Sequence, residues 1–468
     1  MLQTIESINN VVNNFIWGVP AMICIIGVGL YLSLRTGFVQ IRKFPYALKT
    51  TLGRIFKKKE ASDGSMTPFQ AVCTALAGTV GTGNIAGVAG AIAIGGPGAV
   101  FWMWVSAILG MCTKFTEVTL AVHFRERNRH GDYVGGPMYY IKNGLGKNWR
   151  FLAVLYSAFG VLTVFGTGNA TQVNTITTAI DTALINFNVI SESSTGRLNL
   201  ILGIVITLLV GMVLLGGIKR IGSVSEKLVP FMALFYIVLA LGVVILNIGR
   251  VPAVFHDIVY GAFNPSAVTG GVIGSFFLSM KKGVSRGIFS NEAGIGSAPI
   301  AAAAAQTDSP ATQGLISMMG TIIDTLIICT MTGLTIVITD SWNVGLDGVD
   351  VTTRAFQQGL PFNSSIASFI LMVCLVFFAF TTILGWDYYS ERCLEYLIGQ
   401  KPKAIKVYRW IYIACVFIGP YMTVKAVWTI ADIFNGLMAI PNLIALLALN
   451  GVVVAETKKY LDNAKKKF

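Results

Sequence analysis

The sequence predicts an all-α polytopic membrane protein with about eleven transmembrane helices, in which one extra N-terminal helix precedes two inverted sets of five. Three observations support this fold class. The chain of 468 residues is 54% hydrophobic and only 12% charged, whereas a soluble protein carries roughly 25% charged residues. Long apolar runs follow one another along the whole chain. Two of these runs are interrupted by glycine and polar residues.

The apolar runs define the expected spans. A bilayer core about 30 Å thick needs roughly 20 apolar residues per helix. No segment between the runs is long enough for a soluble domain, and the longest connection, 36–66, is rich in charge. We therefore expect helices near 13–34, 68–94, 97–123, 150–185, 199–217, 228–249, 268–304, 312–339, 364–397, 407–422 and 427–455.

The basic residues orient these spans, because Lys and Arg are concentrated in cytoplasmic loops. With the N-terminus outside, 26 of the 35 basic residues fall in connections on the inner side and only four in connections on the outer side. We expect a multi-pass protein of the inner (plasma) membrane, with its N-terminus outside and its C-terminus in the cytoplasm. The formal charge of +13 then reflects topology and does not indicate nucleic-acid binding.

Two spans carry residues that do not suit a continuous helix. The second contains Gly81-Thr82-Gly83-Asn84, and each glycine inside a helix costs about 1 kcal/mol relative to alanine. The seventh contains GIFSNEAGIGSAP, for which we expect a break around Phe289–Glu292. Close helix packing through small residues is the alternative explanation. Irregular backbone at membrane depth is tolerated where it lines a cavity, which favours two unwound binding segments.

The two interrupted spans begin roughly 200 residues apart, and each opens a set of five helices. Five is odd, so the second set has inverted topology. Paired broken helices in inverted repeats are typical of secondary transporters that bind substrate near the midplane. We divide the chain into an N-terminal helix with its basic loop (1–66), two repeats (67–250 and 251–455) and a basic tail (456–468). A second Gly-Thr-Gly-Asn, at 166–169, is out of phase with this repeat, and we interpret it as a coincidence.

Other functional classes find little support. The chain has no H-E-x-x-H, G-x-S-x-G or G-x-x-x-x-G-K-[ST] motif, so neither an enzyme nor an ATP-driven pump is indicated. The seven cysteines are scattered and the three histidines do not cluster, so we expect no metal site and no resident cofactor. A channel remains as an alternative, although the interrupted spans argue against it.

Five runs resemble the alanine or glycine:cation symporter family, over nearly the whole chain. They are TALAGTVGTGNIAGVAGAIAIGGPGAVFWMW, GDYVGGPMYYI, GIFSNEAGIGSAPIAAAAA, TILGWDYYSERCLEYLIG and MAIPNLIALLALNGVVVAET. The resemblance implies a ten-helix LeuT-type core with one extra N-terminal helix. It also implies uptake of a small neutral amino acid together with Na⁺ or H⁺. Alanine, glycine, serine and glutamine all remain open as substrates, as do an exchanger and an amino-acid-gated channel.

A zwitterionic substrate needs donors for its carboxylate, and the freed amides at the start of a half-helix supply them. We expect the amides of Gly81, Thr82 and Gly83 to do so, with Asn84 nearby. Further substrate-binding residues would come from the second break and, by resemblance, from spans four and nine. These are Gln172, Phe289, Asn291, Thr382 and Trp386.

A transported cation needs oxygen ligands. Asp324 lies at membrane depth with no basic neighbour within a turn, and intramembrane acids are functional candidates. By resemblance, the hydroxyls of Thr381 and Thr382 match a sodium site, although such hydroxyls also bond their own helix. Lys114 and Glu117 are spaced to form a buried pair. Arg286 and Asp432 would meet as an outer gate.

Overall fold

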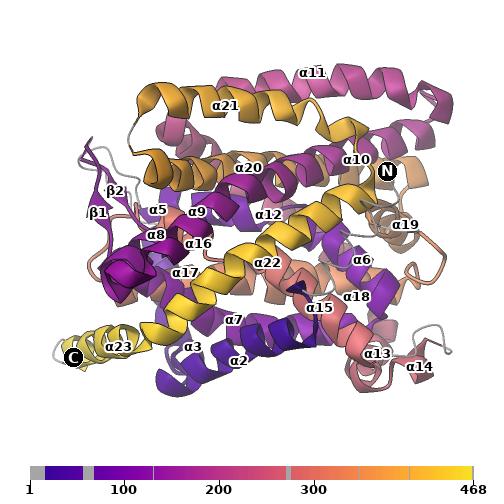
Figure 1. The fold of residues 1–468 in the computed structure, drawn as a ribbon. Coiled ribbons are helices and arrows are strands. Elements are labelled where there is room, and N and C mark those ends of the chain that lie inside the picture. The colour runs from indigo at the N-terminus through magenta and orange to yellow at the C-terminus, as the bar shows by residue number, and fades with distance from the viewer. Residues whose placement is uncertain are drawn as a thin grey trace.

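Hydrophobic helices make up almost all of the computed structural model, which describes residues 16–55, 68–129, 131–269, 276–346, 348–399 and 401–465 (Figure 1). Among these residues the strands are two short ones, β1 (Glu126–Arg127) and β2 (Tyr133–Val134), which pair antiparallel. The all-α membrane architecture expected from composition is therefore confirmed.

Seven helices of the described chain are long and apolar enough to cross a membrane, and one bent pair brings the number to eight. They coincide with eight of the eleven expected spans. Helices also occupy the other three positions, but they are shorter: α2 (Val19–Arg35), α15 (Phe276–Asn291) and α21 (Pro402–Val416). The part of the first expected span before residue 16 lies outside the described residues.

The remaining helices follow in chain order. Up to residue 250 they are α3 (Val39–Arg42), α4 (Phe44–Ile55), α5 (Pro68–Thr79), η1 (Thr82–Asn84), α6 (Ala86–Gly95), α7 (Gly98–His123), α8 (Pro137–Tyr140), η2 (Ile141–Leu145), η3 (Lys147–Trp149), α9 (Arg150–Thr163), η4 (Val164–Ala170), α10 (Thr171–Asn186), η5 (Glu192–Ser194), α11 (Thr195–Leu214), α12 (Gly217–Leu246) and η6 (Ile248–Arg250).

After residue 250 they are α13 (Val251–Phe263), α14 (Pro265–Val268), α16 (Ala298–Ala302), α17 (Pro310–Thr321), η7 (Ile322–Cys329), α18 (Thr330–Ile338), α19 (Val349–Gly359), α20 (Ser364–Ile398), η8 (Gly419–Tyr421), α22 (Val424–Ala448) and α23 (Asn450–Lys465).

Two segments near the ends of the chain carry helices that the expected spans do not include. In the connection 36–66, α3 and α4 occupy the described part. The last expected span, 427–455, is divided at Leu449 into α22 and α23, and α23 continues into the basic tail. In both places the helix carries basic residues, which lower the mean hydropathy but do not prevent a helix.

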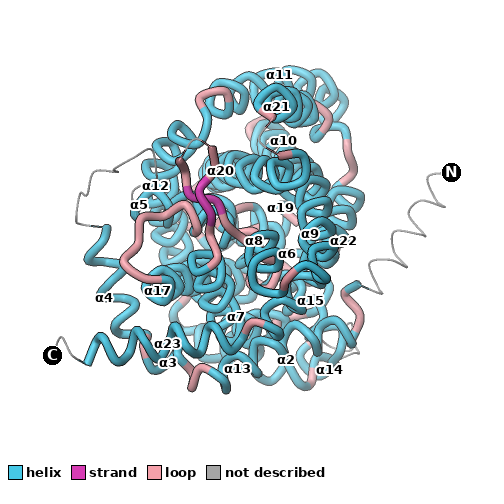
Figure 2. The backbone as a smooth tube through the Cα atoms, turned by 60° about the vertical axis from the view of Figure 1, so that its left-hand side comes forward, coloured by secondary structure: helices cyan, strands magenta, loops and turns pink. Residues whose placement is uncertain are grey.

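Helices that occupy corresponding places in the two halves of the chain pack against each other. The pairs are α6 with α15, α7 with α17, α9 and α10 with α20, and α11 with α21. Figure 2 shows α11 and α21 together at one edge of the molecule, far from α2. In the apolar part of α7, 83% of the residues are buried inside the protein, so other helices surround it. α11 and α12 are largely exposed and are suited to face lipid.

One end of the molecule gathers the connections that we expect to be cytoplasmic. In Figure 1, β1, β2 and the end of α23 lie on the left, while α13 and α14 lie on the right. Contacts between these connections hold that end together: Arg35 donates to Asn450 at 3.0 Å, and His123 lies 3.1 Å from Glu456.

We predict that a cysteine at Asp462, in α23, is protected from an impermeant thiol reagent in intact cells. A cysteine at Gly249, at the opposite end, should be labelled. Both are introduced into a variant without the seven native cysteines, because Cys24 is exposed, and permeabilised cells serve as the control. The positive-inside bias gives the expected direction. The reverse labelling pattern would invert the topology.

Candidate functional site

The first break separates α5 from α6, whose axes are bent by 55°. The chain leaves the helix at Gly81 and passes through the single turn η1. Asn84 closes this turn, because its side-chain oxygen accepts from the Gly81 amide at 2.8 Å. A Cβ at Gly81 would lie 2.3 Å from the Thr382 hydroxyl, so only glycine fits. Backbone amides are thus held inside the bundle, near the start of α6.

Gln172 lies beside this break, and Trp386 packs on the nearby turn that carries the second Gly-Thr-Gly-Asn. Gln172 donates to the Thr167 carbonyl at 2.9 Å, which turns its side-chain oxygen to the Thr82 amide at 3.4 Å. Trp386 is fully buried and packs on Gly168, where an added Cβ would lie 2.2 Å from the Trp386 Cβ. The second Gly-Thr-Gly-Asn, at 166–169, therefore has a structural role: it lies in the π-helical turn η4, which packs against Trp386. Such π-turns often occur at functional sites.

Phe289 covers the other side of the break. A Cβ at Gly83 would lie 3.1 Å from the Phe289 ring. The Phe289 ring packs on Trp428 of α22 with ring centroids 4.8 Å apart. Sequence analysis missed Trp428, because nothing in its apolar surroundings distinguishes it from a lipid-facing aromatic residue.

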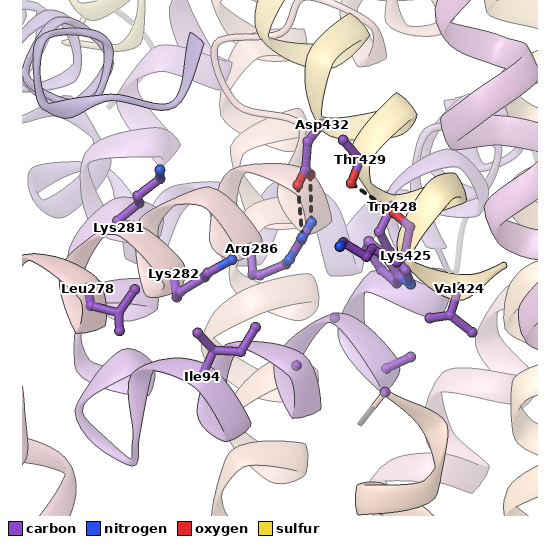
Figure 3. Close-up of a pocket in the computed structure, with 14 residues that line it drawn as sticks. Ile94, Leu278, Lys281, Lys282, Arg286, Val424, Lys425, Trp428, Thr429 and Asp432 are labelled. Carbon is purple, nitrogen blue, oxygen red and sulfur yellow. Dashed lines mark hydrogen bonds and ion pairs between the residues drawn. The ribbon is translucent and has the colours of Figure 1, made fainter. Parts of the chain in front are cut away.

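Beyond Phe289 lies a cavity of about 450 Å³ between α6, α15 and α22, which we call the vestibule (Figure 3). Arg286 and Asp432 meet at its base in a bidentate ion pair, with N–O distances of 2.6 and 2.8 Å. The Arg286 guanidinium also lies 4.6 Å above the centre of the Trp428 ring. Further lysines line the vestibule: Lys281, Lys282 and Lys425. The ion pair and the Phe289–Trp428 contact separate this cavity from the first break.

The second break lies later than expected. Phe289 is still helical, and α15 ends at Asn291. The chain then runs through Glu292, Gly294 and Gly296, all with positive φ (57°, 92° and 84°), before α16 begins. Asn291 caps this break, since it accepts from the Ala293 amide and donates to Thr325. These contacts direct its side chain to η7, whose Asp324 accepts from Asn84 of the first break.

Glu117 of α7 holds the second break in place. It accepts from the Gly294 amide at 2.9 Å and from Asn442 of α22 at 2.6 Å. Asn442 also donates to the Gly294 carbonyl at 2.9 Å and accepts from Tyr140. The expected pair with Lys114 is not formed, and among the described residues the Lys114 ammonium has no hydrogen-bond partner. Sequence spacing suggested a contact within one helix, whereas the partners of Glu117 are 177 and 325 residues away.

The predicted cation residues lie on two sides of η1. Asp324 accepts from Asn84 at 2.6 Å and from Ser290 at 3.1 Å. Thr382 lies across η1, where its hydroxyl is 3.4 Å from the Val80 carbonyl. Thr381 bonds carbonyls of its own helix at 3.0 and 3.1 Å and contacts the sulfur of Met232. Asp324 and the two threonines therefore share no hydrogen-bond partner.

Comparison with known proteins identifies relatives along the full chain. The model of the sodium:alanine symporter family matches residues 2–468. An uncharacterized transporter of Haemophilus influenzae is 51% identical over 99% of this chain and 98% of its own. The sodium/alanine symporter AgcS of Methanococcus maripaludis is 45% identical over 97% of each chain. The probable sodium/glutamine symporter GlnT of Bacillus subtilis is 38% identical over 99% of this chain and 92% of its own.

The contacts of Glu117 predict a specific loss of stability. Glu117→Ala leaves the buried Gly294 amide without an acceptor, which costs about 1–3 kcal/mol. Glu117→Gln keeps one side-chain carbonyl and should recover part of this loss. Melting temperatures of the purified protein in detergent measure both effects, with Glu126→Ala, in a half-exposed ion pair with Lys142, as the control. An unchanged melting temperature for Glu117→Ala would show that the break does not depend on this carboxylate.

Proposed function

The chain belongs to the sodium:alanine symporter family, and on this premise we propose that it carries a small neutral amino acid across the membrane together with Na⁺. The observation that carries the proposal is the first break. Backbone amides and carbonyls that leave the helical bonding pattern at Gly81–Asn84 lie inside the bundle. Gln172, Phe289 and Thr382 contact this segment, and Trp386 follows Thr382 by one turn of α20. Backbone amides at the start of α6 suit a carboxylate.

The aromatic side chains near the break support alanine or glycine as the substrate. Buried aromatic side chains each cover about 150–250 Å² in typical proteins, and here Phe289 packs on Gly83 while Trp386 packs on Gly168. Thr382 packs against Gly81, Phe289 against Gly83 and Trp386 against Gly168, each so closely that a Cβ would collide or press on it. Such close packing leaves little space for a substrate with a long side chain. Glutamine is the second candidate, because a relative is named as a probable sodium/glutamine symporter.

For the cation, two places in the structure offer oxygen atoms. One lies between the Val80 carbonyl and Thr382, with Thr381 on the same turn of α20. The other is Asp324, whose carboxylate contacts Asn84 and Ser290. Na⁺ is a hard cation that selects such oxygens, and two of the relatives described above are named as sodium symporters. We favour the Thr382 place for Na⁺ and assign Asp324 mainly to holding η1.

We further propose a LeuT-type core of two inverted repeats, 67–250 and 251–455, after the N-terminal segment. The packing of corresponding helices supports this proposal. The third expected span (α7) packs on the eighth (α17), and the fifth (α11) packs on the tenth (α21). The vestibule then opens outward, and Arg286 and Asp432 act as the outer gate. In this arrangement substrate reaches the first break when the gate parts, and leaves on the other side after the two halves move.

Uptake by purified protein in proteoliposomes tests the proposal. Labelled alanine should accumulate when an inward Na⁺ gradient is imposed and should not accumulate with K⁺ in its place. Thr382→Val keeps the shape but removes the hydroxyl, so it should raise the Na⁺ concentration needed for half-maximal uptake by about tenfold, the effect of about 1.4 kcal/mol. Asp324→Asn should keep its Na⁺ dependence. Uptake that follows a pH gradient alone, or a current without saturation, would favour H⁺ coupling or a channel.

Competition among alanine, serine, leucine and glutamine tests the assignment of the pocket. Trp386→Ala should weaken alanine uptake, since a lost apolar contact is worth roughly 1–3 kcal/mol per small group, and should admit larger side chains. Gln172→Ala should reduce uptake of all four substrates in equal proportion, because it supports the part that they share. If Trp386→Ala behaves like Gln172→Ala, then Trp386 supports the fold without setting selectivity.

A further inference from the structure

Asp387 is the best candidate for a site that the proposed transport mechanism does not use. It lies in α20 directly after Trp386, and its side chain is fully buried. Among the described residues, neither carboxyl oxygen of Asp387 has a hydrogen-bond partner. Asp387 differs in this respect from the buried acids discussed above. Glu117 and Asp324 each accept at least two hydrogen bonds.

The charges around Asp387 do not balance. Its charged neighbours on α20 are Glu391 and Arg392, and α21 adds Arg409. Arg409 bonds both oxygens of Glu391, at 2.5 and 2.7 Å. Arg392 pairs with Glu395 at 2.6 Å. Two arginines thus neutralise two glutamates, and the carboxyl of Asp387 is the additional acid.

Two tyrosines of α21 also lie near Asp387. Tyr408 and Tyr412 of α21 are its titratable neighbours on that helix. Tyr408 donates to the Val161 carbonyl, and Tyr412 lies within hydrogen-bond distance of the Gly168 and Ile383 carbonyls. An ionised carboxylate without donors in such surroundings is costly by several kcal/mol. A metal cation is not favoured, because the neighbouring Arg409 repels it and no group of three or more His, Cys, Asp or Glu side chains that could hold a metal ion occurs among the described residues.

We propose that Asp387 is a proton-binding site: its carboxyl group carries a proton in this conformation, and that proton maintains the packing of α20 on α21 beside the substrate pocket. Loss of the proton leaves two carboxylates, Asp387 and Glu391, one helical turn apart with one Arg409 between them. Arg409 is then drawn from Glu391 to Asp387, and α21 shifts. Tyr412 connects α21 to Gly168, which packs on Trp386, so the change reaches the pocket wall.

The first test does not depend on transport. In an unfolded chain an aspartate carboxyl loses its proton near pH 4, whereas the folded protein retains the proton on Asp387. The folded state therefore binds one proton more than the unfolded state. As the pH rises, the equilibrium constant for folding falls by up to about tenfold per pH unit. The melting temperature of the full-length protein should fall more steeply with pH than that of Asp387→Asn, which is neutral at every pH. Asp257→Asn, at an exposed position, should follow the wild type.

The second test rests on the proposed function. At saturating Na⁺, alanine uptake by the wild type should fall at alkaline pH, while Asp387→Asn should keep a flat profile. If no variant transports any amino acid, the proposed function fails and the melting series still decides on Asp387. Parallel pH profiles for wild type and Asp387→Asn in the melting series would overturn the proposal. So would failure of both Asp387→Asn and Asp387→Ser to fold while Asp387→Glu folds, because a neutral carboxyl can be replaced by a neutral group.

Discussion

The interior of a membrane offers no water to a broken helix, so each break must find polar partners within the protein. Here each of the two breaks is completed by an acid from a helix in the other half of the chain. Asp324 of η7 accepts from Asn84, which closes the turn at Gly81. Glu117 of α7 accepts from the amide of Gly294. The two arrangements correspond, since α7 and the α17–η7–α18 span follow the first and the second broken helix in the order of the chain.

These reciprocal contacts hold the two halves together at the two breaks, the first of which we propose as the substrate site. A buried carboxylate is costly unless it accepts hydrogen bonds, and the unpaired backbone amides of a break are costly in the same way. Glu117 and the Gly294 amide satisfy each other in the second break, while Asp324 holds the first break through Asn84, which accepts from the Gly81 amide. Both acids therefore have a structural role, and a cation that bound beside either of them would act on a break that is already held in place. The buried ammonium of Lys114 acts electrostatically on Glu117, Glu292 and Asp324, so it reduces the net negative charge of this layer.

The sequence predicts those features whose signal is local. Gly81-Thr82-Gly83-Asn84 combines flexible backbone and polar groups in an apolar run, and the structure breaks the helix there. The sequence predicts the second break around Phe289–Glu292, and the structure places it at the end of this range: Ser290 and Asn291 are polar but remain helical, and the positive φ values begin at Glu292. The role of Glu117 was hidden, since its partners come from distant helices. Trp428 and Asp387 were missed for a similar reason: only packing shows that one covers Phe289 and that the other lacks a partner.

α15 mechanically links the vestibule to the second break. Arg286, which pairs with Asp432, and Phe289, which covers Gly83, are three residues apart and lie on the same face of this helix, with the guanidinium 5.6 Å from the centre of the Phe289 ring. Trp428 contacts both the Arg286 guanidinium and the Phe289 ring, so the ion pair and the side chain that covers Gly83 share one aromatic neighbour. Two residues further on, Asn291 ends the helix and bonds Thr325, beside Asp324. A movement of α15 at the vestibule is therefore transmitted within two helical turns to both sides of η1, where we place the amino acid and the cation.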